Sequence, residues 1–102
     1  MKYEVYILPE AWEELKRLPG HMRQRVKRAI EGLKDNPRPP KSIRLDTSGL
    51  PEVEAELRRL RIERWRIVYA ITEAERFVDI LAIRKRPPYD YGDLERLLAE
   101  LE

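Results

Sequence analysis

Residues 76–84 read Arg-Phe-Val-Asp-Ile-Leu-Ala-Ile-Arg, and the rest of the fold can be predicted outward from this segment. Its apolar residues occupy both faces of a strand, whereas a strand with one solvated face alternates between polar and apolar residues. A strand that is apolar on both faces is typical of the interior of a sheet covered on both sides. We therefore expect residues 76–84 to form a central strand.

Three more strands are expected around this segment. Residues 56–62 and 65–72 have strand spacing, and short turns separate them from each other and from the central strand, which predicts an antiparallel meander. Near the start of the chain, Tyr3, Val5 and Ile7 alternate with Glu4 and Tyr6, as in a half-buried strand. We expect this first strand to pair with the central one.

Two amphipathic helices are predicted between the first strand and the meander. Pro9 suits the first position of a helix, and Leu18-Pro19-Gly20 breaks the chain between the two helices. The helix dipole accounts for the early acids Glu10, Glu13 and Glu14. The apolar stripes are Ala11, Leu15 and Leu18 in the first helix, and Met22, Val26, Ala29, Ile30 and Leu33 in the second.

The remaining segments complete a predicted α+β fold. Residues 38–40 should be extended, and residues 46–51 form a surface loop. Asp90 or Asp93 can cap a short helix in the tail, residues 92–102. The prediction is one domain over residues 1–102, in which a helical hairpin packs on a small antiparallel sheet in the order β-α-α-β-β-β and a short helix follows.

Composition excludes several functional classes. The chain has no cysteine and one histidine, His21, so disulfides, a thiolate nucleophile and a multi-histidine metal site are excluded. No apolar run approaches the roughly 18 residues of a membrane span, and the first residues do not resemble a signal peptide. We expect a cytoplasmic protein with no metal, small-molecule cofactor or membrane contact. The abundance of Glu and Arg is typical of heat-adapted proteins.

Arginines are concentrated in two segments that should be neighbours in the sheet. Residues 58–66 contain five, and Arg84-Lys85-Arg86 follows the central strand. The planar guanidinium group matches phosphate oxygens, so RNA is the natural ligand. The alternative is a solvated face whose arginines pair with nearby acids. The five arginines are Arg58, Arg59, Arg61, Arg64 and Arg66, and the acids are Glu54, Glu56 and Glu63.

Aromatic residues near the arginines could stack on unpaired bases. Trp65 and Tyr69 share strand parity, however, and are better explained as core or edge packing. Arg66 has the opposite parity, so it should stand on the face away from Trp65. Tyr89 and Tyr91 follow the central strand and complete the aromatic set.

These segments together resemble the RelE/ParE superfamily of toxins from toxin–antitoxin pairs, over about residues 3–91. The order and spacing of the pieces carry the resemblance, since each piece alone is common. The pieces are Tyr-Glu-Val-Tyr-Ile-Leu at 3–8, Ala11 with Leu15 and Leu18-Pro19, residues 30–37 ending in Asp-Asn-Pro, Leu60-Arg61, Trp65-Arg66-Ile67-Val68-Tyr69, and Ile83-Arg84-Lys85-Arg86 followed by Tyr89.

The resemblance to RelE-like members implies an endonuclease that cuts messenger RNA on the ribosome without a metal. It implies that Arg66 binds the scissile phosphate and that Arg86 contacts the phosphate or the leaving group. Tyr89, or Tyr91 if the loop is counted differently, would stack on a base or move a proton. Arg59 and Arg61 would hold the RNA, together with Arg84 and Lys85 from the cationic segment after the central strand.

The chain departs from that pattern at two points, and other functions follow from the departures. Some members have lysines where this chain has Arg59 and Arg61, and the family's histidine before the last arginine is replaced by Arg84 or Lys85. Proton transfer would then fall to tyrosine, Lys85 or ribosomal RNA.

The alternative functions are a ParE-like inhibitor of DNA gyrase and a member that binds without cutting. The expected partners are a cognate antitoxin, the ribosome and messenger RNA.

Overall fold

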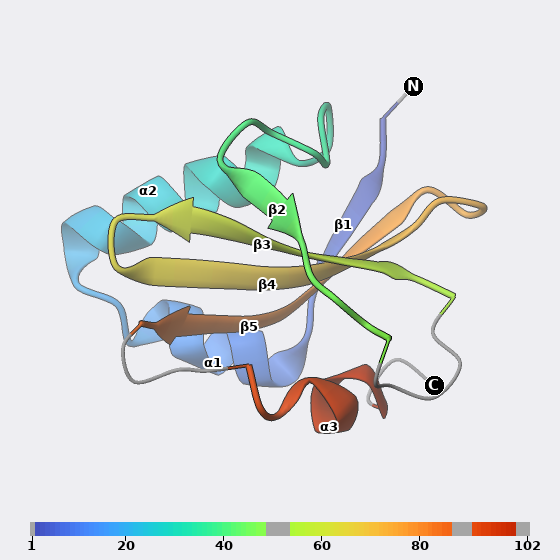
Figure 1. Ribbon diagram of the computed structural model, residues 1–102. Coiled ribbons are helices and arrows are strands. Elements are labelled where there is room, and N and C mark those ends of the chain that lie inside the picture. The colour runs from blue at the N-terminus through green and yellow to red at the C-terminus, as the bar shows by residue number, and fades with distance from the viewer. Residues whose placement is uncertain (1, 49–53, 87–90, 100–102) are drawn as a thin grey trace.

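The computed structural model describes residues 2–48, 54–86 and 91–99, apart from the side chain of Leu94. Figure 1 shows strands β2 to β5 side by side, with α1 and α2 behind them. The elements in chain order are β1 (Glu4–Ile7), α1 (Pro9–Lys16), α2 (Gly20–Gly32), β2 (Ser42–Arg44), β3 (Glu56–Ile62), β4 (Trp65–Thr72), β5 (Phe77–Lys85) and α3 (Leu94–Ala99).

The sheet has the order β1-β5-β4-β3-β2, so the predicted central strand is confirmed as an interior strand. The α+β class, the helical hairpin and the C-terminal helix are also confirmed. The sheet is mixed rather than antiparallel, because β1 runs parallel to β5, with Val5 opposite Val78. Strands joined by a tight turn must be antiparallel, whereas β1 reaches β5 through the helices and the rest of the sheet, which leaves either direction open.

Strand β2 was not predicted. It lies at the edge of the sheet, where Ile43 pairs with Arg59 of β3. The Ser42 backbone N–H and hydroxyl both donate to the Pro39 carbonyl oxygen, at 2.9 and 2.7 Å, and so fix the turn that starts the strand. Three residues are too few to show an alternating pattern, so this strand leaves no readable signal in the sequence.

Each face of the sheet has its own hydrophobic core. The larger core lies under α1 and α2 and includes Leu15, Val26, Leu60, Ile67 and Tyr69. The smaller core lies on the opposite face, where Leu97 of α3 packs against residues of β3, β4 and β5. The members of the smaller core are Leu57, Val68, Ala70, Leu81, Ala82 and Leu97.

An irregularity in β5 changes which face its residues occupy. Val68 of β4 is opposite Ala82, but the next residue, Tyr69, is opposite Ile80, so Leu81 is an extra residue in β5. Leu81 and Ala82 consequently both belong to the smaller core, while Ile83 belongs to the larger one. A bulge of this kind re-aims the side chains that follow it.

The ends of the sheet and the tail complete the description. Beyond Ile7, β1 no longer pairs with β5, and the backbone N–H of the buried Ile83 donates to Oε1 of Glu14 at 2.9 Å. Asp93 lies just before α3, and Leu97 is fully buried. Within residues 2–48, 54–86 and 91–99, no helix is long and apolar enough to cross a membrane.

Candidate functional site

Three arginines form a row across the three middle strands of the sheet, close to the turn between β3 and β4. The strand register places Arg61 of β3 opposite Arg66 of β4, and Arg66 opposite Arg84 of β5. Residues directly opposite each other in an antiparallel pair project to the same face. The neighbouring register position of Val68 and Ala82 belongs to the smaller core, so the arginine row, Arg61, Arg66 and Arg84, lies on the face away from α1 and α2.

Arg66 is the half-buried member of the row that has no carboxylate partner among the described residues. Its Nη1 donates to the backbone oxygens of Glu63 and Trp65, both at 3.0 Å, while its Nε is buried and has no hydrogen-bond partner among the described residues. Burial lowers the pKa of Arg66, and the charges of Arg59, Arg61 and Arg86 act in the same direction. A guanidinium stays charged under these conditions, so Arg66 is a half-buried cation among cations.

Arg86 follows β5 and lies against the tail. Its backbone N–H donates to the Arg64 carbonyl oxygen at 2.7 Å, which fixes the chain just after the strand. Its guanidinium carbon is 5.5 Å from the centroid of the Tyr91 ring, within the range of a cation–π contact. Tyr91 has a positive φ of 66°, an unusual conformation for a residue with a bulky side chain. The structure therefore brings Arg66, Arg86 and Tyr91 into one neighbourhood.

Arg84 belongs to the same row but is occupied by carboxylates. Its Nε donates to Glu14, its Nη1 is 2.9 Å from Oδ2 of Asp93, and its Nη2 is 3.4 Å from Oε1 of Glu10. Burial acts to lower the pKa of Arg84, but Glu14 and Asp93 more than offset it, so the pKa lies above its ordinary value. Arg84 thus links α1, β5 and the start of α3.

The other predicted site residues lie in different places. Arg59 is half-buried on β3, opposite Val68, and so shares the face of the arginine row. Lys85 is exposed and opposite Trp65, which puts it on the face covered by the helices. Tyr89 lies outside the described residues. The predicted parity of Arg66 against Trp65 and Tyr69 is confirmed, since both aromatic residues pack with the larger core.

The alternative interpretation, in which nearby acids neutralise the arginines, holds for part of the hairpin formed by β3 and β4. Arg58 pairs with Glu56 at 2.7 Å, and Arg38 shares the same carboxylate. Glu63, in contrast, pairs with Arg25 of α2. Ion pairing therefore accounts for Arg58, on the helix side of the sheet, and leaves Arg59, Arg61 and Arg66 without an ion pair among the described residues.

Sequence reasoning missed the role of two glutamates. Glu10 and Glu14 were assigned to the helix dipole, whereas both contact Arg84. Burial raises the pKa of the Glu14 carboxyl, although the hydrogen bond from Ile83 and the charge of Arg84 offset part of the effect. The spacing of four residues, which puts both carboxylates on one side of α1, was the available signal.

A metal centre is not part of this arrangement as far as the structure describes it. Among the described residues, no group of three or more His, Cys, Asp or Glu side chains is placed to hold a metal ion. The face of the sheet that carries the arginine row, called the arginine face below, presents fixed cations and hydrogen-bond donors. These groups are suited to a phosphate and to the negative charge that develops on it during a reaction.

A family profile identifies this small α+β domain as a toxin of the kind found in toxin–antitoxin pairs. The profile of the family described as "ParE toxin of type II toxin-antitoxin system, parDE" matches residues 5–87. The chain therefore belongs to this family, within the RelE/ParE superfamily, as a toxin of a type II toxin–antitoxin system.

Solved structures of RelE toxins have the same fold. The archaeal RelE–RelB complex from Pyrococcus horikoshii OT3 is 23% identical, with a TM-score of 0.74 over 87% of this chain and 100% of that chain. The RelBE2 complex of Mycobacterium tuberculosis is 21% identical, with a TM-score of 0.69 over 84% and 100%. A double mutant of free E. coli RelE is 18% identical, with a TM-score of 0.65 over 99% and 98%. A comparison with curated protein sequences gave no match.

Proposed function

We propose that this toxin is a ribosome-dependent endonuclease that cuts messenger RNA. In the proposed reaction a ribose 2′-oxygen loses its proton and bonds to the adjacent phosphorus, while the bond to the 5′-oxygen breaks and that oxygen takes up a proton. The products are a 2′,3′-cyclic phosphate and a 5′-hydroxyl. The observation that carries the proposal is the setting of Arg66, whose buried Nε has no described partner and whose charged neighbours are all cations.

Each arginine of the face has a proposed part in this reaction. Arg66 binds the scissile phosphate and stabilises the charge that builds up as phosphorus becomes five-coordinate. Arg86 assists the leaving oxygen, and Tyr91 holds Arg86 through its ring, or stacks on a base together with Tyr89. Arg59 and Arg61 hold the RNA backbone on the same face. Arg84 is the outer member of the row and reaches RNA if its carboxylate pairs open, whereas Lys85 would contact RNA from the helix side of the sheet.

The group that takes the 2′ proton is the weak point of the chemistry. Among the described residues, the titratable groups whose charges act on Arg66 are Arg59, Arg61, Arg86 and Tyr91. The tyrosine is the one of these four groups that ordinarily exchanges a proton. A general base with a pKa near the working pH contributes roughly 10²–10⁴-fold to a rate. We therefore propose slow cutting, with tyrosine, Lys85 or the ribosome supplying the base.

A second candidate function is inhibition of DNA gyrase by binding. It is favoured by one specific observation, the match of residues 5–87 to the profile of ParE toxins. Inhibition by binding needs no proton acceptor beside the arginines. The same cationic face would then contact gyrase or its DNA, and the reaction described above would be absent.

We also propose that a cognate antitoxin neutralises the protein in the cytoplasm, where ribosomes are found. The family profile describes a toxin of a type II system, and the P. horikoshii and M. tuberculosis structures are complexes of a RelE toxin with its antitoxin. A mainly cationic toxin face is suited to an acidic antitoxin segment, because opposite charges speed association and fix register.

The deciding experiment runs two assays on one preparation. Purified toxin is added to ribosomes translating a defined messenger, and new 3′ ends are mapped; the same toxin is added to a gyrase supercoiling assay. We expect ribosome-dependent cuts and unchanged supercoiling, with the cuts reduced by about 10²-fold or more in Arg66→Ala. An intact messenger together with blocked supercoiling would reject the endonuclease and establish the second candidate.

A further inference from the structure

The turn between β3 and β4 contacts both arginines that the proposed function places at the reacting phosphate. Glu63 and Arg64 form this turn. The Glu63 carbonyl oxygen accepts a hydrogen bond from Nη1 of Arg66 at 3.0 Å, and the Arg64 carbonyl oxygen accepts one from the backbone N–H of Arg86 at 2.7 Å. Two successive carbonyl groups of one turn therefore hold the side chain of one arginine and the backbone of the other.

The direction of the Arg66 guanidinium depends on the conformation of that turn. Among the described residues, its hydrogen-bond acceptors are the carbonyl oxygens of Glu63 and Trp65, each at 3.0 Å. A movement of the turn would displace the Glu63 carbonyl oxygen and, through Arg64, the chain just after β5. An error of about 1 Å in the place of a group that contacts the reacting atoms can cost about 10²-fold in rate.

Glu63 has a backbone conformation that glycine would adopt more easily. Its φ is 53°, whereas the φ of Arg64 is not positive. In a two-residue hairpin turn with this pattern, which is type II′, glycine usually occupies the first position. Because strained residues of this kind cluster at functional sites, the presence of a glutamate here has to be explained by what its carboxylate contacts.

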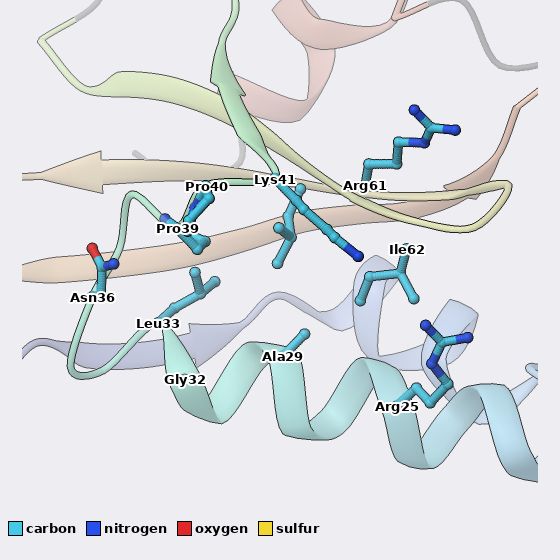
Figure 2. A pocket seen from close by; sticks show the side chains of 11 residues that line it. Arg25, Ala29, Gly32, Leu33, Asn36, Pro39, Pro40, Lys41, Arg61 and Ile62 are labelled. Atoms are coloured by element: carbon cyan, nitrogen blue, oxygen red, sulfur yellow. The ribbon is translucent and has the colours of Figure 1, made fainter.

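The Glu63 carboxylate ties the turn to α2. It pairs with Nη1 of Arg25 at one end of a groove of about 500 Å³ that lies between α2 and the strands β2 and β3. Figure 2 shows the Arg25 side chain rising from α2 toward Ile62, the residue before the turn. Among the described residues, this contact is the only ion pair or hydrogen bond between the turn and a helix.

Stability does not account for this ion pair. The side chains of Arg25 and Glu63 are 47% and 57% exposed, and an ion pair between exposed side chains contributes little to folding. The positive φ of Glu63 acts against folding, and a glycine would remove that penalty. The glutamate at this position therefore has a use other than raising the free energy of unfolding.

We propose that Glu63 and Arg25 are positioning residues of the endonuclease, whose ion pair fixes the turn that holds Arg66 and Arg86 at the scissile phosphate. The inference rests on the proposed function and deepens it by connecting α2 to the two arginines. Both residues act through the carbonyl oxygens of the turn. Since the arginines that hold the RNA backbone stay in place, loss of the pair should slow cutting more than it weakens ribosome binding.

Single-turnover cleavage on ribosomes that carry a defined messenger separates the rate of cutting from binding. With ribosomes at saturation, Glu63→Gln and Arg25→Glu should each cut about tenfold more slowly than the unaltered toxin. The ribosome concentration that gives half of the maximal rate should stay within about twofold. Arg28→Glu is the matched control, because it makes the same change in net charge at an exposed position of α2, and it should cut at the unaltered rate at saturation.

Two further variants separate positioning from stability. The double variant Arg25→Glu with Glu63→Arg restores the ion pair with its charges exchanged, and it should recover cutting to within about threefold of the unaltered rate. Glu63→Gly removes the carboxylate but relieves the backbone. It should therefore cut slowly although its melting temperature is higher than that of Glu63→Ala.

Hydrogen exchange in the free toxin tests the turn itself, without ribosomes. In Glu63→Gln the backbone amide of Arg86 should exchange about threefold faster or more, because its acceptor lies in the released turn. The amide of Val68, a fully buried residue of β4, should exchange as before. Unchanged exchange at Arg86 would reject the turn as the connection between Glu63 and the site.

Three other outcomes would overturn the inference. In the first, the unaltered toxin cuts and Glu63→Gln and Arg25→Glu cut equally fast, which rejects the positioning role and leaves the proposed function standing. In the second, cutting follows the melting temperature, so that Glu63→Gly recovers and the charge-exchanged double variant does not, which makes the ion pair a structural one. In the third, the unaltered toxin leaves the messenger intact, which rejects the proposed function and the positioning role with it, whatever the exchange at Arg86.

Discussion

Arg66 and Arg84 occupy directly opposite positions on β4 and β5, yet their guanidinium groups meet opposite electrostatic surroundings. Arg66 has cations as its charged neighbours and one buried Nε with no described partner, whereas Arg84 is held by Glu14, Glu10 and Asp93. A cation in the first setting lowers its energy by binding an anion. A cation in the second already has its counterions, so its main effect is on stability.

The first prediction concerns Arg66. Replacing it with Ala should reduce messenger cleavage by about 10²-fold or more. The free energy of unfolding should fall by only about 1 kcal/mol, because the hydrogen bonds to the Glu63 and Trp65 carbonyl oxygens are lost but no ion pair with a described residue is. Cleavage is measured on translating ribosomes, and stability by urea denaturation. Arg44→Ala, which removes an exposed arginine from the edge strand β2, serves as the control and should cut normally. A cleavage rate unaffected in Arg66→Ala would remove this residue from the site.

The second prediction is the reverse pattern at Arg84. Arg84→Gln should lower the free energy of unfolding by about 1–3 kcal/mol, because it leaves the half-buried carboxylates of Glu14 and Asp93 without their cation. The Arg84 side chain is 22% exposed, so water can relieve part of the loss. Urea denaturation of the two proteins measures the difference. The double variant Arg84→Gln with Glu14→Gln should recover part of the stability, and an additive further loss would contradict the ion-pair account.

The third prediction is a pH dependence at Asp79, a half-buried residue of β5. Burial raises the pKa of its carboxyl, so the folded protein holds that proton more tightly than the unfolded chain. The stabilising contribution is therefore present below the ordinary pKa and is lost as the pH rises through the raised value. Asp79→Asn should be more stable than the unaltered protein at about pH 7, with a smaller difference at about pH 4. Urea denaturation at the two pH values tests it, and a difference independent of pH would refute it.

The fourth prediction concerns the turn between β3 and β4. Glu63 has a φ of 53°, a left-handed conformation that favours glycine, and its side chain pairs with Arg25. Glu63→Gly and Glu63→Ala both remove the ion pair, and Glu63→Gly alone also relieves the backbone. We expect the glycine variant to be more stable than the alanine variant by about 1 kcal/mol, measured by thermal unfolding. Equal stabilities would show that the turn tolerates a side chain at no cost.

Most of the fold was predictable because it follows from local patterns. The apolar run of residues 76–84 gave the interior strand, and helical spacing gave the helical hairpin. The direction of β1 and the three-residue strand β2 were not predictable, since both depend on contacts between distant parts of the chain. Ala29 shows the same limit at one position: it belongs to the apolar stripe of α2 and packs against the larger core, but it is only half-buried because it also lines a groove.

The types of residue in the candidate site were predictable from the sequence, but the ion pairs that these residues form were less so. Strand parity placed Arg66 on the face away from Trp65. The partners of Arg84 were not predictable from spacing, because Glu14 precedes it by 70 positions and meets it through the docking of α1 on β5. A residue can thus match a pattern of exposed cations while its charge is already engaged elsewhere in the molecule.

The extra residue in β5 determines more than the local shape of the strand. Counting by twos from Ile80, which lies on the helix side, would put Arg84 on the helix side as well. Leu81 inserts one step, and Arg84 instead arrives on the same face as Arg66 and Arg61. A regular strand that kept Leu81 in the ladder would therefore turn Ile83 toward the smaller core and Arg84 toward the larger one, whereas deleting Leu81 would remove the bulge and leave Arg84 opposite Arg66. The alignment of three arginines thus depends on Leu81 being left out of the ladder, and closing the bulge with Leu81 in place would dismantle it without changing a single arginine.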